Sequence, residues 1–515
     1  MTMTQTFRVK ARQMLALSLT AYILSSAIPL VVHSQNILVP TAGTEQLLVK
    51  FDGVSWEVVG RQVLPVPYAS PGDGRLRIDL AAGMEKMVVA ALSDEDLAVS
   101  AHELMPDGQL VSQRIPVSAT LLPVRVPSDH SLSLLQVWSK DRVVGTIDLT
   151  ATGSESWASS GLPPYTTETV LDNGPASNRF DIVFLGDGYQ AADMGKYDRD
   201  VRAMSEYLLS TPPFSNYRQM FNIHKVNVIS RQSGIDHPEQ NLFRDTALDL
   251  TFNYGGISQA VYLPLESEYK VYQAAALVPQ ADAIVVLAND PQFGGSSGPL
   301  HNFTVVTTNP VSKDLLVHEL GHSLGFLGDE SDGRQAPPLR EPTQVNVTLQ
   351  ATVEGLKKVG KWDYWIDSGS ERVGLFPGGM GSRVGVYRPS RTCRMRTISA
   401  PFCPVCTEQI IKRLYTYFRP IESVTPQAKG SLSLTGSTSV VFTVTPIQPV
   451  GHSLRITWAL DGAILDHTDS TLALSLDGLA RGQHTITVTV SDPTPLVRRD
   501  PARALSASLS WTITK

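Results

Sequence analysis

The pair His318 and His322, with Glu319 directly after the first histidine, is the part of this chain whose residue types and spacing could do chemistry. Histidines four residues apart lie on one face of an α-helix, so both imidazoles can bind the same metal ion. A glutamate beside the first histidine can take a proton from a water molecule held by that ion. This HExxH spacing is typical of zinc sites that hydrolyse peptide bonds. We therefore predict one catalytic Zn²⁺, with His318 and His322 as ligands and Glu319 as general base.

The residues around the pair favour an ion over an ordinary core. Leucine and valine fill positions 315–317, and Leu324, Phe326 and Leu327 follow the pair. Burying two imidazoles and a carboxylate in so apolar a segment would cost several kcal/mol if they had no partners. A divalent ion removes that cost. The alternative is two histidines that are hydrogen-bonded inside a core.

A third zinc ligand is expected shortly after the helix, because catalytic zinc usually has three protein ligands and one open position. Gly325 can end the helix and let the chain turn back towards the metal. In metzincins the third ligand comes three residues after such a glycine, but here that place is Gly328, which has no side chain. We expect Asp329 to be the ligand. Glu330 is the alternative, either as ligand or as an acceptor that orients one of the histidines.

Met395 lies in a short segment before the last helix expected in the catalytic region. Metzincins have a methionine in a turn beneath the zinc site at this point, so Met395 is a candidate Met-turn residue. The alternative is a methionine that fills a gap in the core.

The chain has three cysteines, Cys393, Cys403 and Cys406, all close to Met395. They predict one local disulfide, between Cys393 and either Cys403 or Cys406, with one cysteine left over. A second, structural zinc site would want a fourth ligand, and none is obvious nearby in the sequence.

Length and composition indicate an ordinary globular protein of several domains. The chain has 515 residues, of which 42% are hydrophobic and 18% charged. At ~150 residues per domain, about three domains are expected. A net charge of −6 gives no reason to expect nucleic acid or an anionic membrane as partner.

The first 34 residues read as an export signal. Basic residues at positions 8, 10 and 12 precede a largely apolar run, Met14 to Val32, and Val32-His33-Ser34 suits cleavage. An uncleaved membrane anchor is the alternative. We expect cleavage, no stable membrane span afterwards, and a secreted, periplasmic or cell-surface protein.

Three regions are expected after residue 34, and together they predict a multidomain chain with a mixed α/β (α+β) core. Alternating Leu76, Ile78 and Leu80 and frequent Pro and Gly make residues 35–160 β-rich. Strands and helices alternate in 161–422, the catalytic region. Short alternating strands fill 423–515, which predicts an immunoglobulin-like β-sandwich. The expected strands of the core lie at 180–185, 222–229, 283–288 and 303–307, and the expected helices at 193–209, from soon after 310 to about 324, and ending near 418.

Several of these segments together resemble the IgA-peptidase-type zinc metallopeptidases of bacteria. The likeness covers roughly residues 165–420 and rests on RFDIVFLGDGY (179–189), HELGH with Asp329-Glu330, and Cys393-Arg-Met-Arg before FCPVC. It implies a metzincin-like core and hydrolysis of peptide bonds in a protein or peptide, without naming that substrate. The β-rich segment before the core is also similar to one found in the family. Family members often carry tyrosine where Ser331 stands, so a tyrosine that stabilises the oxyanion is not identified.

Two other functions fit the same sequence. The chain could be an inert exported binding or adhesion protein, whose flanking β domains carry the function and whose C-terminal domain binds a surface or glycan. The intact Glu319 argues against that. It could also be a zinc amidase that acts on peptidoglycan peptides, with the same zinc chemistry and a different cleft.

Overall fold

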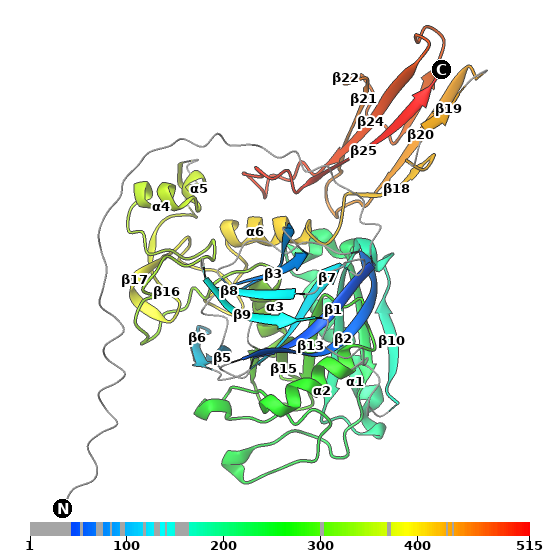
Figure 1. Ribbon diagram of the computed structural model, residues 1–515. Helices are drawn as coiled ribbons and strands as arrows, with labels where there is room; N and C mark the ends of the chain where they lie inside the picture. The colour runs from blue at the N-terminus through cyan, green and yellow to red at the C-terminus, as the bar shows by residue number, and fades with distance from the viewer. Residues whose placement is uncertain are drawn as a thin grey trace, which may run out of the picture. The chain divides into compact units, whose positions relative to one another are not determined.

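The computed structural model (Figure 1) describes residues 43–51, 55–67, 76–82, 85–92, 98–116, 120–127, 134–139, 142–149, 164–298, 303–367, 372–428, 431–434 and 437–515. The expected signal peptide, residues 1–34, lies outside these ranges. Among the helices so described, none is long and apolar enough to cross a membrane.

A mixed sheet of eight strands carries the core of the catalytic region, in the order β10-β12-β11-β13-β15-β14-β5-β6. Strands β12, β11, β13 and β15 are parallel neighbours, and the pairs nearer the two edges are antiparallel. The bounds are β5 Ala98–Leu104, β6 Leu110–Pro116, β10 Thr166–Leu171, β11 Phe180–Asp187, β12 Phe221–Asn227, β13 Ala283–Ala288, β14 Gly295–Ser297 and β15 Phe303–Thr307. The hairpin β5–β6 comes from the expected N-terminal β-rich region, so this sheet spans two of the expected domains.

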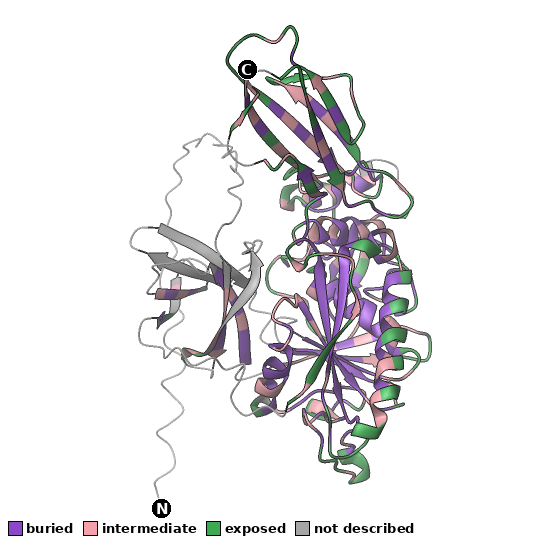
Figure 2. Cartoon of the chain, turned by 90° about the vertical axis from the view of Figure 1, so that its right-hand side faces the viewer, coloured by how far each residue is buried: buried purple, intermediate pink, exposed green. Residues whose placement is uncertain are grey.

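Helices cover both faces of the sheet because its central strands are apolar on both sides. Every residue of β11 is buried. Its Ile182 and Phe184 belong to the same hydrophobic cluster as residues of α1 (Met194–Ser210), α3 (Ser312–Ser323) and α6 (Pro404–Leu414). Val183 and Leu185 point the other way, into a cluster with α2 (Leu265–Ala275). Figure 2 shows the result, a sheet that is buried along its strands with exposed residues on the outer sides of the helices.

The remaining strands before the core form two further sheets. One has the order β2-β1-β7 and the other β4-β3-β8-β9. Their bounds are β1 Gly43–Phe51, β2 Trp56–Pro67, β3 Leu76–Ala82, β4 Glu85–Leu92, β7 Thr120–Pro127, β8 Leu134–Ser139 and β9 Arg142–Asp148. Leu47, Val49 and Val124 pack with Leu135 and Val137 in one buried cluster, so the two sheets share a core.

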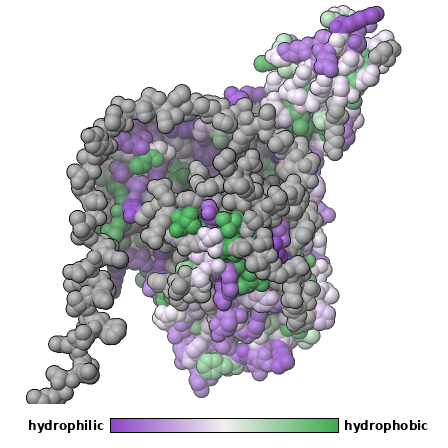
Figure 3. Space-filling view, viewed as in Figure 1, coloured by the Kyte–Doolittle hydropathy of each residue, from purple (hydrophilic) through white to green (hydrophobic). Residues whose placement is uncertain are grey.

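After residue 420 the chain forms two sheets that face each other, β18-β20-β23 and β19-β25-β24-β21-β22. Their common core contains Phe442, Trp458 and Trp511. The bounds are β18 Ile421–Thr425, β19 Ser431–Ser433, β20 Ser439–Pro446, β21 Arg455–Leu460, β22 Ala463–Ile464, β23 Thr471–Ser475, β24 Gln483–Ser491 and β25 Ser506–Thr514. The visible outer face of these strands is mostly hydrophilic or neutral (Figure 3), with exposed apolar residues such as Val441 and Ile464 on different strands.

Short elements complete the chain between α3 and α6. They are α4 Val353–Val359, α5 Asp363–Asp367 and the hairpin β16 Phe376–Gly379 and β17 Ser382–Arg388. The sequence predicted β13 and β15 to the residue and α1 and α3 within a few residues, because their apolar patterns are strong. It did not predict α2, β10, β14 or the hairpin β16–β17.

Asp187, at the end of β11, organises the loop that follows β12. The backbone N–H groups of Leu248 and Leu250 donate to its carboxylate at 2.9 and 3.0 Å, and the hydroxyls of Thr246 and Ser230 donate at 3.0 and 3.2 Å. Burial raises the pKa of Asp187, and these four hydrogen bonds oppose that rise. One buried carboxylate therefore satisfies donors from two parts of the loop.

We predict that Asp187→Ala lowers the free energy of unfolding by about 3 kcal/mol or more, because it leaves several buried donors without an acceptor. Asp245→Ala, which removes the exposed ion pair with Arg231 in the same loop, is the matched control and should cost much less. Chemical denaturation of both variants measures the difference. Equal losses in the two variants would contradict the assigned role of Asp187.

Candidate active site

The helix α3 that carries the histidine pair is buried around almost its whole circumference. Leu315, Leu316 and Leu320 pack into the cluster that covers one face of the sheet. Its first turn is fixed by Asp314, whose Oδ1 accepts a hydrogen bond from Arg394 Nη1 at 2.7 Å. The helix is thereby tied to the turn at residues 393–396, which lies beneath it.

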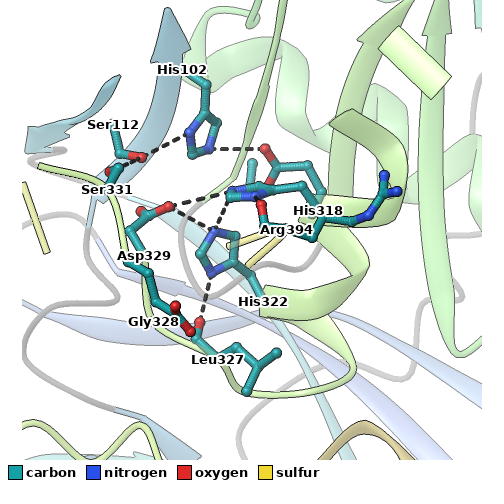
Figure 4. Close-up of polar contacts among 12 residues, drawn as sticks. His102, Ser112, His318, His322, Leu327, Gly328, Asp329, Ser331 and Arg394 are labelled. Carbon is teal, nitrogen blue, oxygen red and sulfur yellow. Dashed lines mark hydrogen bonds and ion pairs between the residues drawn. The ribbon is translucent and has the colours of Figure 1, made fainter. Parts of the chain in front are cut away.

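The two histidines point at one place (Figure 4). His318 Nδ1 lies 3.0 Å from the carbonyl oxygen of Arg394, and His322 Nδ1 lies 2.7 Å from that of Leu327. A carbonyl oxygen can only accept, so each Nδ1 donates and each neutral ring keeps a lone pair on Nε2. The two Nε2 atoms are 3.0 Å apart. Two lone pairs facing each other at this distance require a positive charge between them.

Asp329 completes a triangle with the two rings. Its Oδ1 lies 3.3 Å from His318 Nε2 and 3.4 Å from His322 Nε2. Ligand atoms around a tetrahedral zinc, with bonds of about 2.0–2.1 Å, are about 3.3–3.4 Å apart. The two distances to Asp329 match that spacing, and the distance of 3.0 Å between the two Nε2 atoms is a few tenths of an ångström shorter.

The electrostatics of the triangle favour a cation. Burial alone would raise the pKa of Asp329, but His322 and His318 hold it well below its ordinary value. Burial likewise lowers the pKa of His322, whereas Asp329 and Glu319 raise it to about 9. Burial lowers the pKa of His318. The two Nε2 atoms, 3.0 Å apart, can share at most one proton, so a metal ion would take the place of that proton.

The chain returns to the histidines by a turn that differs from the expected one. Gly325 does not supply the left-handed residue; Phe326 does, with φ of 51°. Gly325 is needed for a close approach instead, because a Cβ there would lie 2.6 Å from the carbonyl oxygen of Gly321. The chain turns back after Gly325 as expected, but the residue with the left-handed backbone is Phe326.

Asn346 fixes the segment that presents Asp329. Its side-chain amide accepts from Gly328 N–H and donates to the Gly328 carbonyl, both at 2.8 Å. Asp329 itself is held by its carbonyl, which accepts from Met380 N–H at 2.7 Å. The side-chain amide of Asn346 thus fixes the backbone of Gly328, and with it the position of Asp329.

Glu330 points away from the histidines. Its Oε1 accepts from Asn346 Nδ2 at 2.9 Å and lies 3.2 Å from Cys406 Sγ. Of the two carboxylates that the sequence left open, the structure brings Asp329 to the histidine pair and takes Glu330 to the cysteines. The cysteines are free thiols here, so the predicted disulfide remains a prediction.

Met395 lies directly beneath α3, the helix that carries His318 and His322. A Cβ on Gly321, between the two histidines, would lie 2.6 Å from Met395 Sδ. The Met395 carbonyl accepts from Glu330 N–H at 2.7 Å. Met395 therefore lies against the backbone of α3 between the two histidines and is joined to the residue after Asp329.

Glu319 is fully buried, and both of its carboxylate oxygens have partners. Ser297 Oγ donates to Oε2, and His102 Nε2 lies 2.9 Å from Oε1. Burial alone would raise the pKa of Glu319, but His102 and the histidine pair lower it to about 2. The group is a carboxylate at neutral pH and can accept a proton.

His102 is a site residue that the sequence analysis missed. It comes from β5, in the β-rich region before the core, and its Nδ1 lies 3.1 Å from Ser112 Oγ on β6. Ser112 contacts Ser331 Oγ at 3.1 Å. Backbone hydrogen bonds join the β5–β6 turn to residues 396 and 398, next to Met395. A lone histidine in a strand offers no sequence pattern, and only the shared sheet places it here.

Comparison with known proteins supports a peptidase. Residues 169–371 match the model of the family described as IgA Peptidase M64, and none of the curated proteins matches the chain. The matched segment contains α3 and Asp329, whereas His102, Met395 and the cysteines lie outside it.

We predict that Gly321→Ala destabilises the protein although alanine normally favours a helix over glycine by ~1 kcal/mol. The new Cβ would overlap Met395, which is buried and cannot move freely, and overpacking costs about 1–3 kcal/mol. Calorimetry of a double-mutant cycle with Met395→Ala checks this, because removing the Met395 side chain should relieve most of the cost.

Gly195→Ala in α1 is the matched control, since a Cβ there meets its nearest atom at 3.8 Å and should be neutral or stabilising. If Gly321→Ala lowers the free energy of unfolding by the same amount with and without the Met395 side chain, Met395 does not support α3.

Proposed function

We propose that the chain is a zinc-dependent endopeptidase, which is supported by the match of residues 169–371 to the model of the IgA peptidase M64 family. The observation that carries this proposal is the triangle of His318 Nε2, His322 Nε2 and Asp329 Oδ1, whose sides are 3.0–3.4 Å. Its substrate is a protein or peptide.

The donor set fits zinc. Two neutral imidazoles and one carboxylate are ligands that catalytic zinc sites use, with a fourth position left for water or substrate. His102 offers a further donor, since one of its ring nitrogens lies within 4.8 Å of a ring nitrogen of each of the two histidines. We assign the third ligand to Asp329 rather than His102, because Asp329 is close to both rings and His102 is paired with Glu319. A zinc ion held there supplies Lewis acidity, which polarises a peptide carbonyl and makes a neighbouring water more acidic.

Glu319 is the proposed general base. Its carboxylate accepts a proton from the attacking water and then donates that proton to the departing amine nitrogen. Ser297, on β14, donates a hydrogen bond that orients Glu319 Oε2, so Glu319 Oε1 is left to accept the proton. The low pKa of Glu319 keeps it ionised until the water loses its proton.

His102 is paired with Glu319 Oε1, the oxygen that is proposed to accept the proton. With its Nε2 at 2.9 Å from Glu319 Oε1, it takes the place that a water would hold. We propose that His102 holds Glu319 ionised in a resting form and leaves Oε1 when substrate enters.

The finer assignments of fold and location follow the sequence. We propose a metzincin-like core, with Met395 as its Met-turn residue, and an immunoglobulin-like arrangement for the two sheets after residue 420. An exported protein fits the first 34 residues, and the C-terminal sheets are the candidate site for a surface or glycan ligand. A binding protein without catalytic activity does not need an ionised, buried carboxylate at Glu319, so this residue favours an enzyme.

We predict that Glu319→Gln retains metal and lowers kcat by about 10²–10⁴-fold, because the amide keeps the shape and cannot accept the proton. Glu206→Gln, on the exposed side of α1, is the matched control and should match the wild type. Cleavage of a peptide library together with elemental analysis measures both properties. An active Glu319→Gln enzyme would refute the role of the glutamate.

We predict that His102→Ala keeps its metal and raises kcat/KM by up to about tenfold, because one charge-assisted hydrogen bond worth about 1.5 kcal/mol no longer has to break. Steady-state kinetics with metal analysis tests this, and Glu103→Gln, the next residue of β5, is the control. Loss of metal would make His102 a ligand instead, and a large loss of kcat would make it a catalytic residue.

A further inference from the structure

Three cysteines and a glutamate from separate segments meet beside the catalytic site. Cys393 lies in the turn that carries Met395, Cys403 and Cys406 lie at the start of α6, and Glu330 follows Asp329. One sulfur or carboxylate oxygen from each lies within 4.8 Å of all the others. All four side chains are buried. These four residues are called the Cys₃Glu cluster below.

The spacing of the sulfur atoms suits a metal ion better than a bond between them. Cys393 Sγ and Cys406 Sγ are 3.7 Å apart. A disulfide bond is about 2.05 Å long. Two thiolates on a tetrahedral zinc, each bound at about 2.3 Å, are about 3.8 Å apart.

The backbone around the sulfur atoms favours thiolates. Cys403 N–H donates to Cys393 Sγ at 3.3 Å. Cys403 is the N-cap residue of α6 and Cys406 lies in its first turn, where the helix dipole stabilises negative charge. Cys403 and Cys406 also have the C-x-x-C spacing that is common among zinc ligands.

Glu330 brings a free oxygen to the cluster. Its Oε1 is used by Asn346 and Cys406, whereas its Oε2 has no hydrogen-bond partner among the described residues, although the side chain is fully buried. A buried carboxylate oxygen without a partner is costly, and a cation beside it would remove that cost.

We propose that the Cys₃Glu cluster binds a second zinc ion, with Cys393, Cys403, Cys406 and Glu330 as its four ligands. Soft thiolates select zinc over magnesium or calcium, and four protein ligands leave no open position, so this ion is structural. It joins the Met395 turn, the start of α6 and the segment that presents Asp329. The inference does not depend on the proposed peptidase activity.

Zinc content of the purified full chain tests the inference. We expect two zinc ions per chain in the wild type, one in Cys406→Ser, and one in the double variant His318→Ala, His322→Ala. If the catalytic assignment alone is wrong, the wild type carries one ion, which the histidine variant keeps and the cysteine variant loses. Equal zinc content in the wild type and Cys406→Ser would overturn the cluster site.

Cobalt replacement covers the case in which cysteine variants fail to fold. The histidine double variant loaded with Co²⁺ should show thiolate-to-cobalt charge-transfer absorption, and zinc should compete it away. Alkylation of the unfolded, metal-free wild type should modify all three cysteines. An intact mass lower by two hydrogen atoms, with one cysteine modified, would show a disulfide and overturn the proposal, as would cobalt without the charge-transfer band.

Discussion

The arrangement of the site depends on two imidazole nitrogens that face each other at 3.0 Å inside a buried helix. Each ring has its other nitrogen committed to a backbone carbonyl, so neither can turn away without leaving a buried polar group unpaired. A cation between the rings would make this arrangement stable, and Asp329 would balance its charge. The surrounding elements can be understood as the means of keeping these three side chains in place.

Those means come from distant parts of the chain. The turn at Met395 accepts the His318 hydrogen bond, holds Glu330 by its backbone and packs under Gly321. Asn346 clamps the residue before Asp329, and the β5–β6 hairpin adds His102 from the other end of the sheet. A site assembled from so many segments has little freedom, which suits a centre whose donors must be preorganised before a metal binds.

The sequence predicted the parts whose information is local. The spacing of His318 and His322 and the apolar runs of β11, β13 and β15 are patterns within a few residues, and Asp329 follows from its distance to the helix. His102 and the partnership of Glu330 with the cysteines could not be predicted, because they depend on strand pairing and on packing between segments far apart in the chain. For the same reason the sequence showed three cysteines close together and not the glutamate that faces them.

The most direct test of this account is anomalous X-ray scattering at the zinc absorption edge from crystals of the full, zinc-loaded chain. The account predicts an ion at about 2.0–2.2 Å from His318 Nε2, His322 Nε2 and an oxygen of Asp329. A map without an ion between these atoms, or an ion held by His102 in place of Asp329, would contradict it.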